Sequence, residues 1–143
     1  MQVRHILFDK GREIYAITAD ATLAEAIRTL AQRRIGAVVV TGEDGSLVGI
    51  LSERDVVRAL AEGQGGVLTR PVSAFMTRGI TTCTEDDTVD GLMELMTMGR
   101  FRHIPVLAQG RIVGIVSIGD VVKTRIAETV AEAATLRDYI ATG

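Results

Sequence analysis

The sequence predicts a mixed fold of helices and strands, α/β (α+β), made of two similar β-α-β-β-α units and a C-terminal helical tail. Three observations support this prediction. The chain contains an internal repeat, each copy alternates short apolar runs with stretches of helical periodicity, and the last part of the chain has almost no glycine or proline. With 143 residues, 47% of them hydrophobic, the chain can bury one core or two smaller ones.

The repeat is clearest where each copy ends, because 49–57 reads GILSERDVV and 114–122 reads GIVSIGDVV. Placing Gly49 on Gly114 aligns a Ser-x-x-Asp motif and two valines in both copies. Farther upstream, Thr22 aligns with Thr88 once one residue is removed from the turn of the second copy. Identities of this kind continue along the whole unit, which indicates a duplication.

Both copies have the same order of elements. A strand is followed by a helix with an N-cap residue, an apolar strand, a glycine-centred turn, and a strand that enters a helix at Ser-x-x-Asp. In the first copy these are the strand 14–18, the helix opened by Asp20 or Thr22, the strand 36–40, the turn 42–45 and the strand 47–51. In the second copy they are the strand 80–83, the helix opened by Asp86 or Thr88, the strand 103–107, the turn 109–110 and the strand 112–116. Because the strands are apolar on both faces, we expect helices to cover the sheets.

The boundaries follow from this order. We expect a first unit with the N-terminal segment at 1–61, a glycine-rich linker at 62–71, a second unit at 72–126 and a helical tail at 127–143. A short helix at 72–76 should lead into the second unit. The tail should carry an apolar stripe that packs on the body or on another subunit. Its members are Ile126, Val130, Ala133, Ala134, Leu136 and Ile140.

The Ser-x-x-Asp motif at a strand–helix junction has two interpretations. A helix N-terminus offers free N–H groups, and an aspartate in the first turn can accept two hydrogen bonds side by side, which suits the two adjacent hydroxyls of a ribose. The other interpretation is a capping box, in which serine and the acidic residue only stabilise the helix end. A duplication copies a structural cap as readily as a binding site, so the motif by itself leaves both open.

Composition narrows the classes of function. A net charge of −2 and 3% aromatic residues argue against a nucleic-acid partner. The apolar runs are far shorter than the roughly 18 residues of a membrane span, and we expect neither a signal peptide nor a membrane partner. The single cysteine, Cys83, favours a reducing, cytoplasmic setting and an inert buried thiol. His5 and His103 are far apart, so we expect no metal site.

The whole pattern resembles a tandem pair of CBS domains, over about 14–60 and 72–126. The residues that carry the resemblance are Met76-Thr77, the run RHIPV at 102–106 and both Ser-x-x-Asp ends. The resemblance implies two units packed with pseudo-twofold symmetry and two clefts between them. It also implies an adenosine-containing ligand (AMP, ADP, ATP, NAD(H) or S-adenosylmethionine), with no catalytic cofactor. Two paired modules would form a flat homodimer through apolar helical faces.

Each cleft is implied to be composite, with the Ser-x-x-Asp of one unit facing strands of the other. One candidate site consists of Ser52, Arg54, Asp55, Thr77, Thr82, Arg102, His103, Ile104 and Pro105. The other consists of Tyr15, Ile17, Gly36, Ala37, Val38, Ser117, Gly119 and Asp120. We expect the first site to prefer the more phosphorylated ligand, because the second has Gly36 and Ala37 where the first has Arg102 and His103. A phosphate grip in the second site would have to come from Lys10 or Arg12.

These expectations converge on a non-catalytic regulatory module for signal transduction that senses an adenosine compound. The alternative is a structural or partner-binding adaptor with vestigial clefts. An enzyme is not expected, because no nucleophile–base pair and no hydrolase motif occur in the sequence. The sequence identifies no downstream protein partner.

Overall fold

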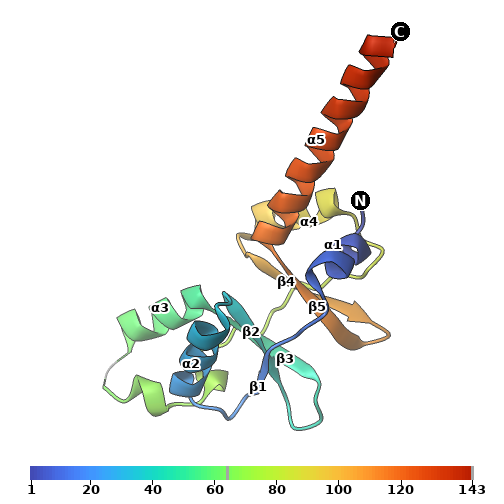
Figure 1. The fold of residues 1–143 in the computed structure, drawn as a ribbon. Helices are drawn as coiled ribbons and strands as arrows, with labels where there is room; N and C mark the ends of the chain where they lie inside the picture. Colours follow the sequence, from blue (N-terminus) through green and yellow to red (C-terminus); the bar gives the residue numbers. More distant parts are fainter. Residues whose placement is uncertain (64, 143) are drawn as a thin grey trace.

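The computed structural model describes residues 1–63 and 65–142, and the predicted β-α-β-β-α order is complete in the first unit and lacks its first strand in the second. Gln64 of the predicted linker and Gly143 of the predicted tail lie outside the described residues. The first unit consists of β1 (Ala16–Thr18), α2 (Leu23–Arg33), β2 (Ala37–Thr41), β3 (Leu47–Ser52) and α3 (Glu53–Glu62). The second consists of α4 (Val89–Gly99), β4 (His103–Ala108), β5 (Arg111–Ser117) and α5 (Ile118–Thr142). Figure 1 shows the two units joined by an extended segment.

The two sheets share one register at the edge that carries the Ser-x-x-Asp motif. In the first unit β1 runs parallel to β2, and β2 pairs antiparallel with β3, with Ala37 opposite Ser52. In the second unit β4 pairs antiparallel with β5, with His103 opposite Ser117. Each serine is therefore the last residue of a strand and the residue before a helix, as the repeat predicts.

The predicted strand 80–83 is wrong as a full strand, because it shrinks to a single parallel bridge between Cys83 and Val106. In the first unit the N–H of Val39 donates to the carbonyl of Tyr15 at 3.2 Å, which extends the parallel ladder. The repeat places Pro105 where Val39 stands, and proline has no N–H to donate. One ladder hydrogen bond is therefore lost in the second copy. The first-copy strand is also shorter than expected, since it starts at Ala16 and not at residue 14.

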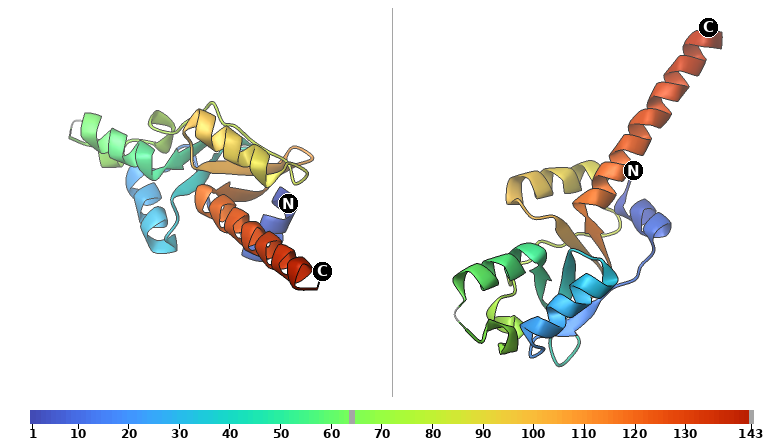
Figure 2. Two further views of the ribbon diagram at one scale, coloured as in Figure 1. Left: turned by 90° about the horizontal axis from the view of Figure 1, so that it is seen from above. Right: turned by 60° about the vertical axis from the view of Figure 1, so that its left-hand side comes forward.

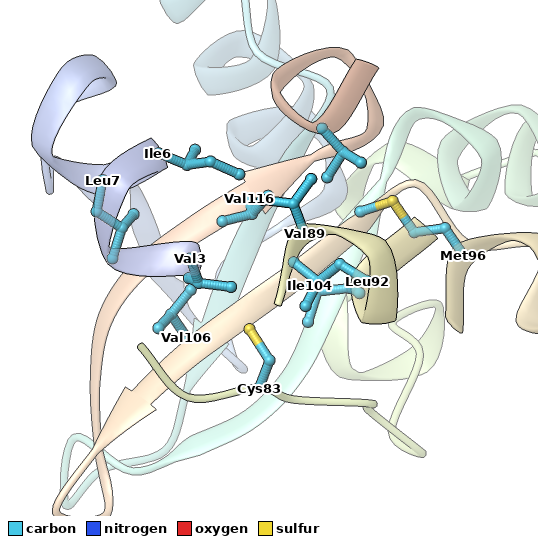
Figure 3. Packing of buried hydrophobic residues seen from close by; sticks show 11 residues of the cluster. Val3, Ile6, Leu7, Cys83, Val89, Leu92, Met96, Ile104, Val106 and Val116 are labelled. Atoms are coloured by element: carbon cyan, nitrogen blue, oxygen red, sulfur yellow. The ribbon is translucent and has the colours of Figure 1, made fainter. Parts of the chain in front are cut away.

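An N-terminal helix, α1 (Val3–Lys10), was not expected from the sequence. Its apolar side chains at helical spacing, Val3, Ile6 and Leu7, are buried in the core of the second unit (Figure 3). Conversely, the segment that leads into the second unit contributes to the core of the first unit. It forms two 3-10 turns, η1 (Val67–Thr69) and η2 (Val72–Ala74), in place of the predicted helix at 72–76, and it packs on the first unit.

Two matching bridges show that α1 and the segment of η1 and η2, which we call the two lead-in segments, occupy equivalent places. Gln2 pairs with Thr88, and Pro71 pairs with Thr22, the residue that the repeat aligns with Thr88. The strand glycines explain how closely the segments pack. A Cβ on Gly49 would lie 2.5 Å from the sulfur of Met76, and one on Gly114 would lie 2.6 Å from Cδ2 of Leu7. Each unit is thus completed by the chain segment that precedes the other unit.

The C-terminal helix α5 begins at the second Ser-x-x-Asp motif and runs without a break to Thr142, which confirms the predicted helical continuation. Val121 anchors its first turns in the core, and the N-terminal amino group lies 3.2 Å from a carboxylate oxygen of Glu128. Beyond this point the helix projects away from both units (Figures 1 and 2). The residues of the predicted apolar stripe, from Ile126 to Ile140, are all exposed.

Candidate functional site

Both Ser-x-x-Asp motifs form complete capping boxes. The N–H of Ser52 donates to Oδ2 of Asp55 at 2.9 Å, and the N–H of Asp55 donates to Oγ of Ser52 at 3.3 Å. The second copy repeats these bonds between Ser117 and Asp120 at 2.9 and 3.2 Å. The structural interpretation of the motif is therefore realised in both copies. A binding role for either aspartate depends on what else surrounds its carboxylate.

Asp55 is buried, with 7% of its surface exposed, yet its carboxylate lines a cleft between the two units. One oxygen, Oδ2, is used by the capping box. The other, Oδ1, receives a hydrogen bond from Oγ1 of Thr77 at 3.2 Å, and Thr77 belongs to the segment that leads into the second unit. A hydroxyl group from a ligand could take the place of the Thr77 hydroxyl without changing the kind of bond that Asp55 makes.

The cleft beside Asp55, which we call the Asp55 cleft, has a volume of about 260 Å³. It is composite, as expected, because α3 supplies one wall and the chain between α4 and β4 supplies the other. Of the predicted residues, Ser52, Arg54, Asp55, Thr77, Arg102 and His103 line it. Sequence reasoning did not assign Gly36, Ile50, Glu53, Arg58, Arg100 and Phe101 to this cleft. Of these, only Arg58 could have been predicted from the sequence, because it lies one helical turn after Arg54.

Three predicted residues do not line the Asp55 cleft. Ile104 is completely buried in the core of the second unit, since successive side chains of a strand point to opposite faces and His103 takes the cleft side. Pro105 is buried too, and Thr82 is exposed outside the cleft. The prediction of these three as direct lining residues is not supported by their positions.

The Asp55 cleft is rich in guanidinium groups. Arg54 and Arg58 come from α3, whereas Arg100 and Arg102 come from the chain that precedes β4. Arg54 also bridges the units, because its Nη1 donates to the carbonyl of Arg100 at 2.9 Å. Against these four cations stand only the carboxylates of Glu53 and Asp55. The cleft can therefore attract an anionic group while it offers one carboxylate to a hydroxyl.

A second cleft between the units, which we call the Ser117 cleft, has a volume of about 330 Å³. The predicted residues Tyr15, Gly36, Ala37 and Ser117 line it. The other four predicted residues do not: Ile17 packs against the first core, Val38 is fully buried within that core, and Gly119 and Asp120 lie outside the lining. Lys10 lines the cleft as anticipated, whereas Arg12 forms an ion pair with Glu85 instead.

Asp120 has a different neighbour from Asp55. Nζ of Lys10 lies 2.6 Å from Oδ2 of Asp120 and donates to the carbonyl of Ile115 at 2.9 Å. Burial by itself would raise the pKa of Asp120. The hydrogen bonds from Lys10 and Ser117, together with the lysine charge, outweigh burial and hold that pKa below its ordinary value. The carboxylate is thus ionised and already paired.

The two clefts meet at Gly36 and His103, which line both of them. A Cβ on Gly36 would lie 3.0 Å from the imidazole ring, so the absence of a side chain there makes room for His103. Burial lowers the pKa of His103, and the carboxylates of Glu53 and Asp120 oppose this only in part. His103 is therefore a neutral imidazole near pH 7, placed between the two clefts.

The described residues give no indication of a reactive cysteine, a metal site or a membrane-spanning helix. Burial raises the pKa of Cys83 to about 12, so its thiol stays protonated near neutral pH. Within residues 1–63 and 65–142, no three His, Cys, Asp or Glu side chains gather in a way that could hold a metal ion. None of the helices in the described ranges combines the length and apolar character of a membrane span.

Comparisons with known proteins agree with the fold. Residues 3–62 and 72–127 each match the family model described as the CBS domain. A CBS-domain containing protein from Agrobacterium tumefaciens is 47% identical, with a TM-score of 0.85 over 87% of this chain and 99% of that one. The chain spans 66% and 63% of the lengths of two curated relatives that it matches.

Two further solved structures contain ligands. The CBS domain pair of protein MJ0100, solved in complex with 5′-methylthioadenosine and S-adenosyl-L-methionine, is 26% identical, with a TM-score of 0.79 over 90% of this chain and 98% of that one. A CBS domain protein from Pyrobaculum aerophilum, solved in complex with AMP, is 30% identical, with a TM-score of 0.75 over 84% and 89% of the two chains. All of these ligands contain adenosine.

Proposed function

Because the chain belongs to the CBS-domain family and carries two such domains, we propose that it is a non-catalytic regulatory module that binds an adenosine-containing ligand in the Asp55 cleft. The observation that carries this proposal is the arrangement around Asp55. A carboxylate whose second oxygen accepts only from a hydroxyl that a ligand could replace lies in the same composite cleft as four arginines. A ribose with phosphate groups attached presents the complementary chemistry.

The roles of the lining residues follow from their chemistry. The Asp55 carboxylate accepts hydrogen bonds from the two ribose hydroxyls, and the Ser52 hydroxyl donates or accepts one more. The arginines of α3 and of the segment before β4 neutralise the phosphates, with bidentate contacts where their geometry allows. Ile50 and Phe101 provide apolar surface for the base. This assignment favours AMP, ADP, ATP or NAD(H) over S-adenosylmethionine, whose sulfonium group would add a cation to a cationic cleft.

Two relatives with adenosine ligands support the ligand class, and the composite nature of the cleft supports a regulatory role. Arg54 already reaches from α3 to the carbonyl of Arg100 in the other unit. A ligand held by both units therefore binds one relative orientation of the units better than another. Occupancy shifts their equilibrium by that difference in affinity and no more.

We further propose that the chain forms a homodimer through α5. The positions Val122, Ile126, Thr129, Ala133, Leu136 and Ile140 follow a heptad spacing along the projecting helix. A single projecting helix of this length is marginal in water, so a second helix is needed to cover its apolar side chains. A parallel partner places Glu132 beside Arg137 of the partner helix. An antiparallel partner would place Lys123 near Arg137, which is repulsive.

The adaptor alternative also has a specific observation in its favour. Both aspartates take part in capping boxes, and each carboxylate also has a further partner, Thr77 at Asp55 and Lys10 at Asp120. In this alternative the clefts are vestigial and the exposed helical surfaces bind a partner protein.

The single cysteine of the sequence, Cys83, is a buried free thiol. Because a free thiol suits a reducing compartment, we propose a cytoplasmic location whether the protein is a sensor or an adaptor.

Mass spectrometry of small molecules released from freshly purified protein tests the ligand class without presupposing one. We expect an adenosine compound to be released. Isothermal titration calorimetry with adenosine, AMP, ADP, ATP, NAD and S-adenosylmethionine then ranks the ligands. A ligand at 100 times its Kd should raise the free energy of unfolding by about 2.7 kcal/mol. If no adenosine compound is released and calorimetry detects no binding, the adaptor alternative is favoured.

A further inference from the structure

The two equivalent carboxylates, Asp55 and Asp120, are satisfied by chemically different partners from the lead-in segments. At Asp55 the partner is the neutral hydroxyl of Thr77 at 3.2 Å. At Asp120 it is the ammonium group of Lys10, which lies 2.6 Å from Oδ2, the oxygen that also accepts the capping-box bond from the Ser117 N–H. The capping-box bonds are otherwise alike in the two copies, so the lead-in segments make the main difference between the two carboxylates.

The two lead-in segments contact the units in equivalent places but through different groups. The segment around η2 pairs through Pro71 with Thr22, and α1 pairs through Gln2 with Thr88, so each contacts the N-cap residue of a helix in the unit that it does not precede. Thr77 continues with backbone hydrogen bonds to Ile50 in both directions, at 2.9 and 3.0 Å. The other lead-in segment is the helix α1, which ends at Lys10. The Lys10 side chain donates to the carbonyl of Ile115, the residue that the repeat aligns with Ile50.

The Lys10 ammonium is well held. It contacts two oxygens, the Asp120 carboxylate and the Ile115 carbonyl, and only 33% of the lysine side chain and 21% of the aspartate side chain are exposed. The lysine brings a positive charge to the ionised carboxylate, whereas a sugar hydroxyl would offer a hydrogen bond without a charge of its own. Lys10 lines the Ser117 cleft whereas Asp120 does not, so a ribose in that cleft meets the ammonium group before the carboxylate. To reach the carboxylate it would have to displace a cation, whereas a ribose entering the Asp55 cleft displaces only a hydroxyl.

We infer that Lys10 is an intramolecular occupant of the ribose-binding carboxylate of the second site, so that the Ser117 cleft is closed to nucleotides and the Asp55 cleft is the single receptive site. This inference rests on the proposed function. It adds that a side chain of the protein limits binding to one nucleotide per chain. Lys10 is then a specificity-determining residue that separates two otherwise equivalent sites. It does not serve as the phosphate contact that the sequence suggested.

Isothermal titration calorimetry with ADP tests this inference on the full chain and on the variant Lys10→Met. Methionine keeps a long apolar stem and removes the ammonium group. We expect the wild type to bind one ADP per chain and Lys10→Met to bind two, the second at least tenfold more weakly because the Ser117 cleft lacks the arginine cluster. The double variant Lys10→Met/Asp120→Asn should bind one again. Arg12→Met is the matched control, since Arg12 pairs with Glu85 outside the cleft, and it should bind one.

The possible results separate the two proposals. Two ADP molecules on the wild type, or a single one on Lys10→Met, would overturn the inference about Lys10 and leave the Asp55 site intact. Failure of both proteins to bind ADP or any other adenosine compound would overturn the proposed function, and the inference with it. The thermal unfolding of ligand-free Lys10→Met is measured in parallel, and the variant Lys10→Gln replaces it if methionine disturbs folding.

Discussion

The variants Asp55→Ala and Asp55→Glu separate the capping role of Asp55 from its proposed role in binding. Asp55→Ala removes the bond from the Ser52 N–H and leaves the Thr77 hydroxyl without its acceptor. We expect this to lower the free energy of unfolding by about 1–2 kcal/mol. If ribose makes two hydrogen bonds to the ionised carboxylate, the same change should cost about 3 kcal/mol of binding, roughly a hundredfold in Kd for ADP.

Asp55→Glu gives the sharper comparison, because Ser-x-x-Glu is itself a capping box. The longer side chain keeps the cap but moves the carboxylate away from the position that the ribose hydroxyls need. We expect a stability within about 1 kcal/mol of the wild type and an ADP affinity at least tenfold weaker. Urea denaturation of the ligand-free proteins gives the stability, and calorimetry gives the affinity. Asp120→Ala is the matched control, with a lost cap but an unchanged affinity at the Asp55 cleft.

The account of Asp55 would be refuted if Asp55→Glu bound ADP as tightly as the wild type, or if Asp55→Ala lost stability while its affinity stayed the same. Either result would show that the carboxylate only caps α3. The adaptor alternative would then explain why the motif was kept in both copies of the repeat.

Three other predictions concern charge, pH and assembly. Arg102→Ala should weaken ADP binding about tenfold and leave adenosine binding within twofold; equal losses in calorimetry would show that Arg102 does not contact phosphate. Burial lowers the pKa of His103, so its contribution to stability is complete above its ordinary value of 6.5 and is lost as the pH falls through its lower folded value. The unfolding free energy should therefore decline below about pH 6.5, and His103→Gln should flatten that decline in urea titrations; an unchanged pH profile would contradict the assignment. Leu136→Asp should convert the dimer to a monomer in sedimentation equilibrium without changing ADP affinity per chain, whereas a dimer that survives would rule out α5 as the interface.

The repeat made much of the fold predictable. Matching Gly49 and Gly114 located both strand–helix junctions, because strands, turns and caps leave local signals in apolar periodicity and in residue type. The strand near Cys83 was overestimated because its pairing depends on a distant residue, Pro105, that cannot donate a hydrogen bond. A local apolar run does not report whether its partner strand can complete the ladder.

The site was predictable in part for the same reason. Ser52, Asp55 and Arg102 were found from motifs, and the structure places all three on one cleft. Arg100 and the Lys10–Asp120 pair could not be found in this way, because both depend on how segments far apart in the sequence cross between the units. Residues such as Ile104 were assigned to the site as part of a run, although alternation along a strand sends every second side chain into the core.

A crystal structure of the full chain grown with ADP would show which cleft holds the nucleotide and which groups contact it. We expect one ADP per chain in the Asp55 cleft, with its ribose hydroxyls on the Asp55 carboxylate, its phosphates among the arginines of α3 and the segment before β4, and Lys10 still paired with Asp120. A nucleotide bound only in the Ser117 cleft, or an Asp55 carboxylate that contacts no ligand in crystals saturated with ADP, would contradict this expectation.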